Sequence, residues 1–255
     1  MYRYIYGPVS SWRLGRSLGV DPLSRQDKIC SFNCLYCQLG EALAYELERR
    51  VFVATTEIIE EIERLPKIEM DYLTLSGRGE STLAENLGEI VESLRRFRKE
   101  PVAVLTNSSL MNRDDVRKEL SLADLVVVKL DAPSQRLFER INRPAKGVNL
   151  GGILEGIKRF REEYRTRLAL QIMFIGENKD QVNELASLAF KLQPDEIQIN
   201  TPLRPSPIKP LSKEAISKIR GCFKGLNTIS VYNAERKGAK PLNLEDTIKR
   251  RGVNL

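Results

Sequence analysis

Short apolar runs alternate with amphipathic segments along most of the chain. Continuous runs of four to eight apolar, β-branched residues are typical of buried strands, whereas apolar residues spaced three and four apart are typical of helices. The runs lie at 17–20, 72–76, 102–107, 125–131, 168–175 and 196–201, with a further one at 228–232. The amphipathic segments lie at 55–65, 83–98, 114–120, 150–164, 180–191 and 213–223.

This alternation predicts an α/β fold built from repeated strand–helix units. Strands that are buried on both faces are expected to be continuously apolar, and such strands are normally parallel. The six main units predict a partial (βα)6 barrel, and 255 residues suffice for it as one domain. We place this core at 1–211, where a loop with four prolines (201–210) ends it, and a C-terminal helix with a basic extension packed on the core at 212–255.

Charge and composition narrow the range of possible functions. The chain has 41 Lys and Arg against 34 Asp and Glu, a formal charge of +7, which favours a polyanionic partner, although solvated surface charges explain the excess equally well. Histidine is absent, which excludes histidine-ligated metals and a histidine general base. No apolar stretch approaches the length of a membrane span, and no signal sequence is recognised, so we expect a cytoplasmic protein with no membrane partner.

Three of the four cysteines, Cys30, Cys34 and Cys37, lie within eight residues in the spacing C-x3-C-x2-C. Closely spaced thiolates are soft ligands that suit an iron–sulfur cluster or zinc. A [4Fe-4S] cluster that only carries electrons usually takes four cysteines, so three would leave one iron open. The alternatives are a zinc site completed by Cys222 and three unrelated buried thiols, and we expect Cys222 to be a packed core thiol.

Polar residues follow the strand at 72–76, at the end of the strand where parallel αβ barrels bind ligands. The segment Ser-Gly-Arg-Gly-Glu supplies Ser76, Gly77, Gly79 and Glu80. Glycines allow a ligand to approach the backbone, and a glutamate can accept a hydrogen bond from an ammonium group. The alternative is an ordinary turn with a helix cap at Ser81 or Thr82.

The later strands carry further candidate site residues. Asn107 and Ser108 end one strand and suit ribose hydroxyls or a carboxylate, although helix capping or an Asx turn also explains them. Lys129 and Asp131 alternate in an apolar strand and therefore share a face, either as site residues in the lumen or as an inward ion pair. Two more polar positions in β-rich runs, expected near a cofactor, are Gln171 and Asn200.

The cysteine loop, with the aromatic Tyr36 before Cys37, resembles the signature C-x3-C-x-aromatic-C of the radical S-adenosylmethionine (SAM) superfamily. The resemblance implies a TIM-like partial barrel in which Cys30, Cys34 and Cys37 hold one [4Fe-4S] cluster and Tyr36 lies near the adenine of SAM. It also implies that the cluster cleaves S-adenosyl-L-methionine to a 5′-deoxyadenosyl radical, which takes a hydrogen atom from the substrate.

The segment 77–80 is similar to the Gly-Gly-Glu-Pro motif of that superfamily, which contacts the methionine amino group, except that Ser81 replaces the proline. Over residues 3–211 the chain further resembles the small group related to the tRNA wyosine synthase, through the motifs Leu-Thr-Asn107, Lys-Leu-Asp131 and Ile-Asn-Arg-Pro144. This resemblance implies modification of a tRNA base, Lys129 and Asp131 at the catalytic centre, and a low-potential electron donor such as ferredoxin or flavodoxin.

That synthase carries a second cluster on cysteines ahead of its signature, and no cysteine precedes Cys30 here, so we expect action on a different tRNA base. A glycyl-radical activating or other protein-modifying radical SAM enzyme is an alternative, and so is a zinc-stabilised RNA-binding protein without activity. The basic residues expected to contact RNA phosphates are Arg13, Arg16, Arg25, Arg204 and Lys209.

Overall fold

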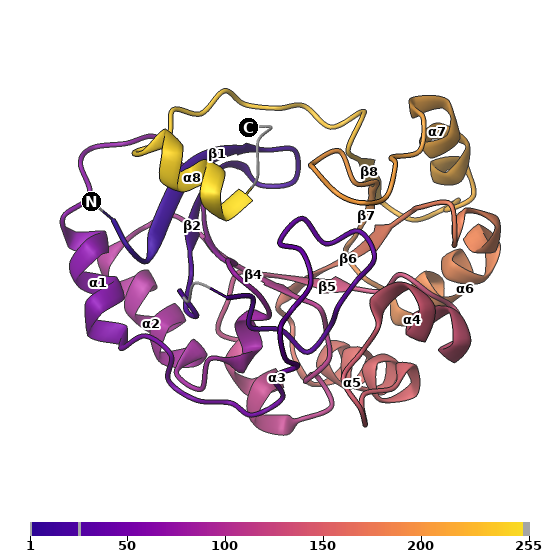
Figure 1. Ribbon diagram of the computed structural model, residues 1–255, viewed down its shortest axis with the longest axis horizontal. Coiled ribbons are helices and arrows are strands. Elements are labelled where there is room, and N and C mark those ends of the chain that lie inside the picture. Colours follow the sequence, from indigo (N-terminus) through magenta and orange to yellow (C-terminus); the bar gives the residue numbers. More distant parts are fainter. Residues whose placement is uncertain (1, 25–26, 252–255) are drawn as a thin grey trace.

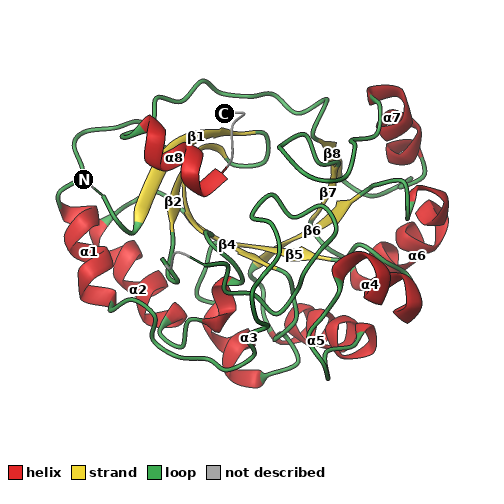
Figure 2. Ribbon diagram, in the orientation of Figure 1, coloured by secondary structure: helices red, strands yellow, loops and turns green. Residues whose placement is uncertain are grey.

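A computed structural model describes residues 2–24 and 27–251. Within these residues, eight strands form a single sheet in chain order, from β1 to β8. The sheet curls into an open barrel, and the helices α1 to α6 lie along its outer side (Figures 1 and 2). The α/β partial barrel predicted from the sequence is therefore confirmed.

The predicted parallel strands are present, with ends that differ by one or two residues. Neighbouring strands from β2 to β8 pair in parallel. Their bounds are β2 Gly15–Val20, β3 Tyr72–Leu75, β4 Val102–Thr106, β5 Leu125–Lys129, β6 Arg167–Met173, β7 Glu196–Asn200 and β8 Thr228–Ser230.

The sequence pattern did not predict the first strand, β1 (Ile5–Ser11), which pairs antiparallel with β2. Gly7 and Pro8 interrupt its apolar run, and proline normally argues against a strand. The structure accommodates them because the register shifts between Tyr6 and Val9. The turn 12–14 that follows brings Leu14 into a cluster with the lumen-facing side chains of β4, β5 and β6.

Most predicted helices are confirmed, and their bounds are α1 Thr55–Glu63, α2 Leu87–Phe97, α3 Asp114–Leu120, α5 Leu150–Glu163, α6 Val182–Leu192 and α7 Lys213–Gly221. Two start later than predicted, because the 3-10 turns η1 (Ser81–Leu83) and η2 (Lys179–Gln181) precede α2 and α6. The helices α4 (Gln135–Asn142) and α8 (Leu244–Arg251) were not predicted, since each has only eight residues and is mostly polar.

The two faces of each strand have different partners. In β5, Val126 and Val128 pack against the helices, whereas Leu125 and Val127 face the lumen. Because side chains alternate along a strand, Lys129 continues the lumen-facing row. In the same way Gln171 follows Ala169 on β6, so both polar side chains reach the lumen.

The last part of the chain returns to the first strand, and α8 lies beside β1 (Figure 1). The Leu242 N–H donates to the Gly7 carbonyl at 2.6 Å, and the Gly7 N–H donates to Thr247 Oγ1 at 3.2 Å. In the described part of the chain, no helix is long and apolar enough to cross a membrane.

Candidate active site

The cysteine loop leaves the carboxyl end of β2 and is held on one side by the glycine segment that follows β3. The Ile29 N–H donates to the Arg78 carbonyl, and the Glu80 N–H donates to the Ile29 carbonyl, both at 2.9 Å. A Cβ on Gly79 would lie 1.6 Å from that Ile29 oxygen. Gly79 is therefore required for the contact that precedes Cys30.

The other side of the loop is held by the end of α4, for which the sequence analysis predicted no structural role. The Leu35 N–H donates to the Ile141 carbonyl at 2.9 Å, and the Ala145 N–H donates to the Ser31 carbonyl at 2.8 Å. Asn142 adds a side-chain contact, because its Nδ2 donates to Cys34 Sγ at 3.5 Å. The loop is thus positioned by segments more than 45 residues apart in the chain.

The thiols of the loop lie in a largely desolvated environment. Cys30 is buried, and Cys34 and Cys37 are half-buried. Burial raises the pKa of the Cys30 thiol to about 12 and also raises the pKa of Cys34. Side-chain amides contact two of the sulfurs, because Asn107 Nδ2 lies 3.6 Å from Cys30 Sγ and Asn142 Nδ2 donates to Cys34 Sγ. Among the residues described, no three Cys, Asp or Glu side chains meet closely enough to hold a single metal ion.

The prediction for Cys222 was wrong. It lies at the exposed end of α7 and not in the core, because the next residue, Phe223, takes the buried position of that turn. Cys222 Sγ contacts only the Lys218 carbonyl among the hydrogen-bond partners described, at 3.6 Å. It is not among the residues that line the cavity described next.

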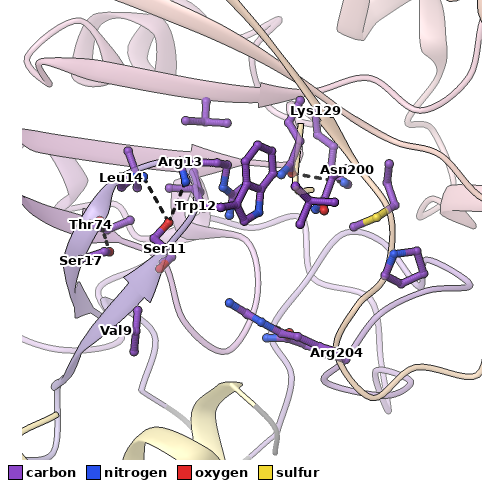
Figure 3. Close-up of a pocket in the computed structure, with 18 of the residues that line it drawn as sticks. Val9, Ser11, Trp12, Arg13, Leu14, Ser17, Thr74, Lys129, Asn200 and Arg204 are labelled. Carbon is purple, nitrogen blue, oxygen red and sulfur yellow. Dashed lines mark hydrogen bonds between the residues drawn. The ribbon is translucent and has the colours of Figure 1, made fainter. Parts of the chain in front are cut away.

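A cavity of about 420 Å³ runs through the lumen from the cysteine loop to the β1–β2 turn. Figure 3 shows the part of it around Trp12, Lys129 and Arg204. Most residues that the sequence indicated for the site line it: Cys30, Tyr36, Cys37, Ser76, Gly77, Gly79, Glu80, Asn107, Lys129, Gln171 and Asn200. Cys34, Ser108 and Asp131 lie beside these residues but do not line the cavity.

Glu80 is almost completely buried at the cysteine end of the cavity. Its carboxylate accepts hydrogen bonds from Thr106 Oγ1 and the Asn107 N–H, both at 2.6 Å, and from the hydroxyl and N–H of Thr82. Burial raises the pKa of this carboxyl group above its usual value. Glu80 itself, and neither Ser81 nor Thr82, caps the following 3-10 turn.

Asn107 and Ser108 are adjacent in the chain but point to different places. Asn107 Nδ2 donates to Ser31 Oγ at 2.9 Å, in the cysteine loop. Ser108 has a left-handed backbone, with φ of 72°, and its Oγ bonds the N–H and carbonyl of Lys129 at 3.0 and 3.2 Å. Ser108 therefore fixes the end of β5, whereas Asn107 faces the cavity.

Lys129, Asp131 and Tyr36 form one buried network. Lys129 Nζ lies 3.5 Å from Asp131 Oδ1 and 4.8 Å from the centre of the Tyr36 ring. The Tyr36 hydroxyl donates to Asp131 Oδ2, and burial raises the pKa of Tyr36 well above its usual value, which keeps this donor protonated. Asp131 also accepts from Asn142 Nδ2 and the Met173 N–H, both at 2.8 Å, so protein donors satisfy its carboxylate.

Gln171 and Asn200 lie on the same part of the cavity wall. Gln171 Oε1 accepts from Lys129 Nζ at 3.5 Å, but its buried Nε2 has no hydrogen-bond partner among the residues described. Asn200 Oδ1 accepts from the Thr201 N–H at 2.9 Å. The Gln171 side chain therefore lines the cavity, whereas its Nε2 is a buried donor without a protein partner among the residues described.

Two of the basic residues expected to contact RNA, Arg13 and Arg204, line the cavity, and Arg25 lies outside the described residues. Arg16 instead bonds Asp71 at the amino end of the strands, which is the opposite end from the cysteine loop. Lys209 is exposed and does not line the cavity. The sequence analysis overlooked Trp12 and Arg236, which also line the cavity, because the strand before Trp12 was not predicted.

Comparisons with known proteins agree with this geometry. The Radical SAM superfamily profile matches residues 28–189. The UPF0026 protein slr1464 of Synechocystis sp. is 45% identical over 207 residues, which cover 80% of this chain and 77% of that protein. The UPF0026 protein MJ1312 of Methanocaldococcus jannaschii is 40% identical over 228 residues, covering 86% and 70%. A probable GTP 3′,8-cyclase of Saccharolobus islandicus is 26% identical over 212 residues, covering 82% and 65%.

Solved structures share the fold. SuiB of Streptococcus suis, solved with S-adenosylmethionine, superposes with a TM-score of 0.61 over 80% of this chain and 48% of its own, at 14% identity. A radical SAM methyltransferase of Sphaerobacter thermophilus gives 0.62 over 84% and 65%, at 19% identity. The family profile spans the cysteine loop and the strands β3 to β6, which is more than half of the chain. The protein is therefore an enzyme that belongs to the radical SAM superfamily.

Proposed function

We propose that the protein holds one [4Fe-4S] cluster on Cys30, Cys34 and Cys37 and uses SAM to modify a base in tRNA. Membership of the superfamily implies the cluster and SAM. The donor set fits a cluster, because three soft thiolates share one loop and amide N–H groups of Asn107 and Asn142 point at two of the sulfurs. Each thiolate of such a cluster binds a different iron, so the thiols need not converge on one point.

The residues that would hold SAM lie beside the loop. The carboxylate of Glu80 is suited to the cofactor's ammonium group, and Gly77 and Gly79 leave backbone free of side chains along the same wall. Tyr36 is suited to a position near the adenine. When bound, the cluster and SAM supply abstraction of a hydrogen atom from the substrate, and the electron comes from a low-potential donor such as ferredoxin or flavodoxin.

The chain's own residues order the site for this chemistry. Asp131 fixes the Tyr36 hydroxyl and accepts from the Met173 backbone, so that it connects the cysteine loop to β6. Lys129 is held over the Tyr36 ring and beside Asp131, which keeps its charge at the cavity wall. We assign both as positioning residues, with Lys129 the one whose side chain reaches the cavity.

A tRNA substrate is supported by charge. Arg13, Lys129, Arg204 and Arg236 line the cavity, while Glu80 is the one carboxylate among the described lining residues. A cationic lumen and a formal charge of +7 favour a polyanion. The name of the Saccharolobus relative, a probable GTP 3′,8-cyclase, also points to nucleotide chemistry in this superfamily.

Mass spectrometry of total tRNA nucleosides, from cells with and without the gene, tests the proposal. We expect one modified nucleoside to disappear with the gene and to return with the wild-type copy, but not with a Cys34→Ser copy. An unchanged nucleoside profile would show that tRNA is not the substrate.

A further inference from the structure

The end of the cavity lined by Trp12, Arg204 and Arg236 has its own set of ligand-binding groups. The β1–β2 turn places Trp12 in the lumen, and Figure 3 shows its indole projecting into the same space as Arg204. Trp12 is half-buried, and the Arg13 guanidinium carbon lies 5.4 Å from the centre of its ring. An aromatic face that points into a cavity is suited to stacking with a flat ligand.

The charge of this end is cationic. Asp131 balances the charge of Lys129, and the other basic side chains that line the cavity are Arg13, Arg204 and Arg236. These three residues come from the β1–β2 turn, the loop after β7 and the segment after β8, so the fold gathers them from distant parts of the sequence. Arg204 is oriented by the cysteine loop, because its Nη1 donates to Gln38 Oε1 at 2.9 Å.

An unsatisfied polar group adds a third feature. Gln171 is only 7% exposed, it lines the cavity, and its Nε2 has no hydrogen-bond partner among the residues described. A buried amide donor without a partner is costly, so a ligand acceptor such as a base carbonyl or ring nitrogen would stabilise it.

We propose that this end of the cavity is the substrate subsite and that it binds a single 5′-nucleotide. The base stacks on Trp12, an acceptor atom of the base meets the Gln171 amide once that side chain turns its Nε2 toward the cavity, and the phosphate lies between Arg204 and Arg236. Guanidinium groups match the geometry and charge of a phosphate. This inference rests on the proposed function, since it names the substrate class of the same cavity.

The chain has one tryptophan, so fluorescence excited at wavelengths that tyrosine does not absorb reports Trp12 alone. We would titrate the purified holoprotein with guanosine 5′-monophosphate, guanosine and ribose 5-phosphate. We expect saturable quenching by the nucleotide, about tenfold weaker binding of the nucleoside, and no quenching by the sugar phosphate. Equal binding of nucleotide and nucleoside would overturn the phosphate assignment and with it the proposal.

Single substitutions test the two proposed phosphate contacts separately. Arg204→Gln and Arg236→Gln should each weaken nucleotide binding by about tenfold and leave guanosine binding unchanged. Lys209→Gln is the matched control, because Lys209 lies in the same loop as Arg204 but does not line the cavity. The affinity of this variant for the nucleotide should equal that of the wild type. Equal weakening by Lys209→Gln would mean a general charge effect and would refute the subsite.

A further titration with a short RNA identifies whether the nucleotide is free or part of an RNA chain. Quenching by a single-stranded RNA trimer supports a nucleotide presented within RNA. Quenching by the free nucleotide, together with an unchanged tRNA profile, supports the subsite but refutes tRNA modification. A gene-dependent tRNA nucleoside without quenching by either probe supports the proposed function and refutes the subsite.

Discussion

The four cysteines of the chain fall into two environments. Cys30, Cys34 and Cys37 share a loop that is bonded on both sides by other segments, whereas Cys222 is exposed at the end of α7. Replacing a ligand by serine exchanges a soft thiolate for a hard hydroxyl, which binds iron poorly. Single Cys→Ser changes at the three loop positions should therefore abolish the brown colour of anaerobically purified protein.

Cys222→Ser is the control for that prediction. It should retain the iron and sulfide content of the wild type, because Cys222 neither lies in the loop nor lines the cavity. Loss of iron in Cys222→Ser, measured by the same assay, would instead make Cys222 a fourth ligand of the cluster.

Glu80 gives a second prediction for a single residue. Glu80→Gln keeps the shape of the side chain and an oxygen that can accept from Thr106 Oγ1 or the Asn107 N–H, but it removes the negative charge. If the carboxylate binds the ammonium group of SAM, affinity for SAM should fall about tenfold or more, since a charge-assisted hydrogen bond is lost. Equilibrium dialysis of the cluster-loaded variant measures this affinity, and unchanged binding would exclude the contact.

How far single residues could be predicted depends on the range of their contacts. The cysteine spacing and the alternation of Lys129 with its neighbours are local, so both were visible in the sequence. Asn142 was not, because its contact with Cys34 joins residues 108 positions apart. Ser108 was expected in the cavity, but its left-handed backbone turns its hydroxyl to Lys129, and φ cannot be read from residue type.

At the scale of elements, the junction of the cysteine loop with the glycine segment carries a prediction. Gly79→Ala would place a Cβ against the Ile29 carbonyl and push the two segments apart. We expect the variant to fold but to incorporate less than half of the wild-type iron, measured per protein chain. Gly176→Ala is the matched control, because a Cβ there meets nothing within 4 Å. Equal iron content in both variants would show that the junction does not position the loop.

The pattern of elements was predictable where packing is regular. Strands such as β5 have apolar residues on both faces, so their continuous runs identify them. β1 and α4 lack such a signal, because proline interrupts β1 and charged residues dominate α4. Both contribute to the site, since β1 leads into the turn with Trp12 and α4 ends beside the cysteine loop.

At the scale of the whole molecule, the last helix, α8, packs beside the first strand, β1 (Figure 1). Asp71, which precedes β3, links three parts of the chain: its carboxylate accepts from the Arg16 side chain at 3.2 Å and from Lys237 Nζ at 3.0 Å. The hydrogen bonds from Arg16 hold the pKa of Asp71 well below its usual range, although burial opposes this shift. The Asp71 contacts therefore couple the N-terminal hairpin and the C-terminal extension to the sheet.

This coupling predicts a pH-dependent contribution to stability. A carboxyl group with a lower pKa in the folded state stabilises the fold above its unfolded pKa, about 3.9, and that stabilisation is lost as pH falls toward the folded pKa. Asp71→Asn should thus lower the free energy of unfolding by about 1 kcal/mol at pH 7 and pH 5, and by less at pH 3. Urea unfolding of the wild type and Asp71→Asn at each pH measures this difference in free energy. Effects that the two proteins share, such as loss of a bound cluster in acid, cancel.

Glu69→Gln is the control, because Glu69 also pairs with Arg16 but its side chain is 84% exposed. A difference between wild type and Asp71→Asn that stays constant from pH 7 to pH 3 would contradict the shifted pKa, and an equal loss in Glu69→Gln would place the stabilisation on Arg16 rather than on Asp71.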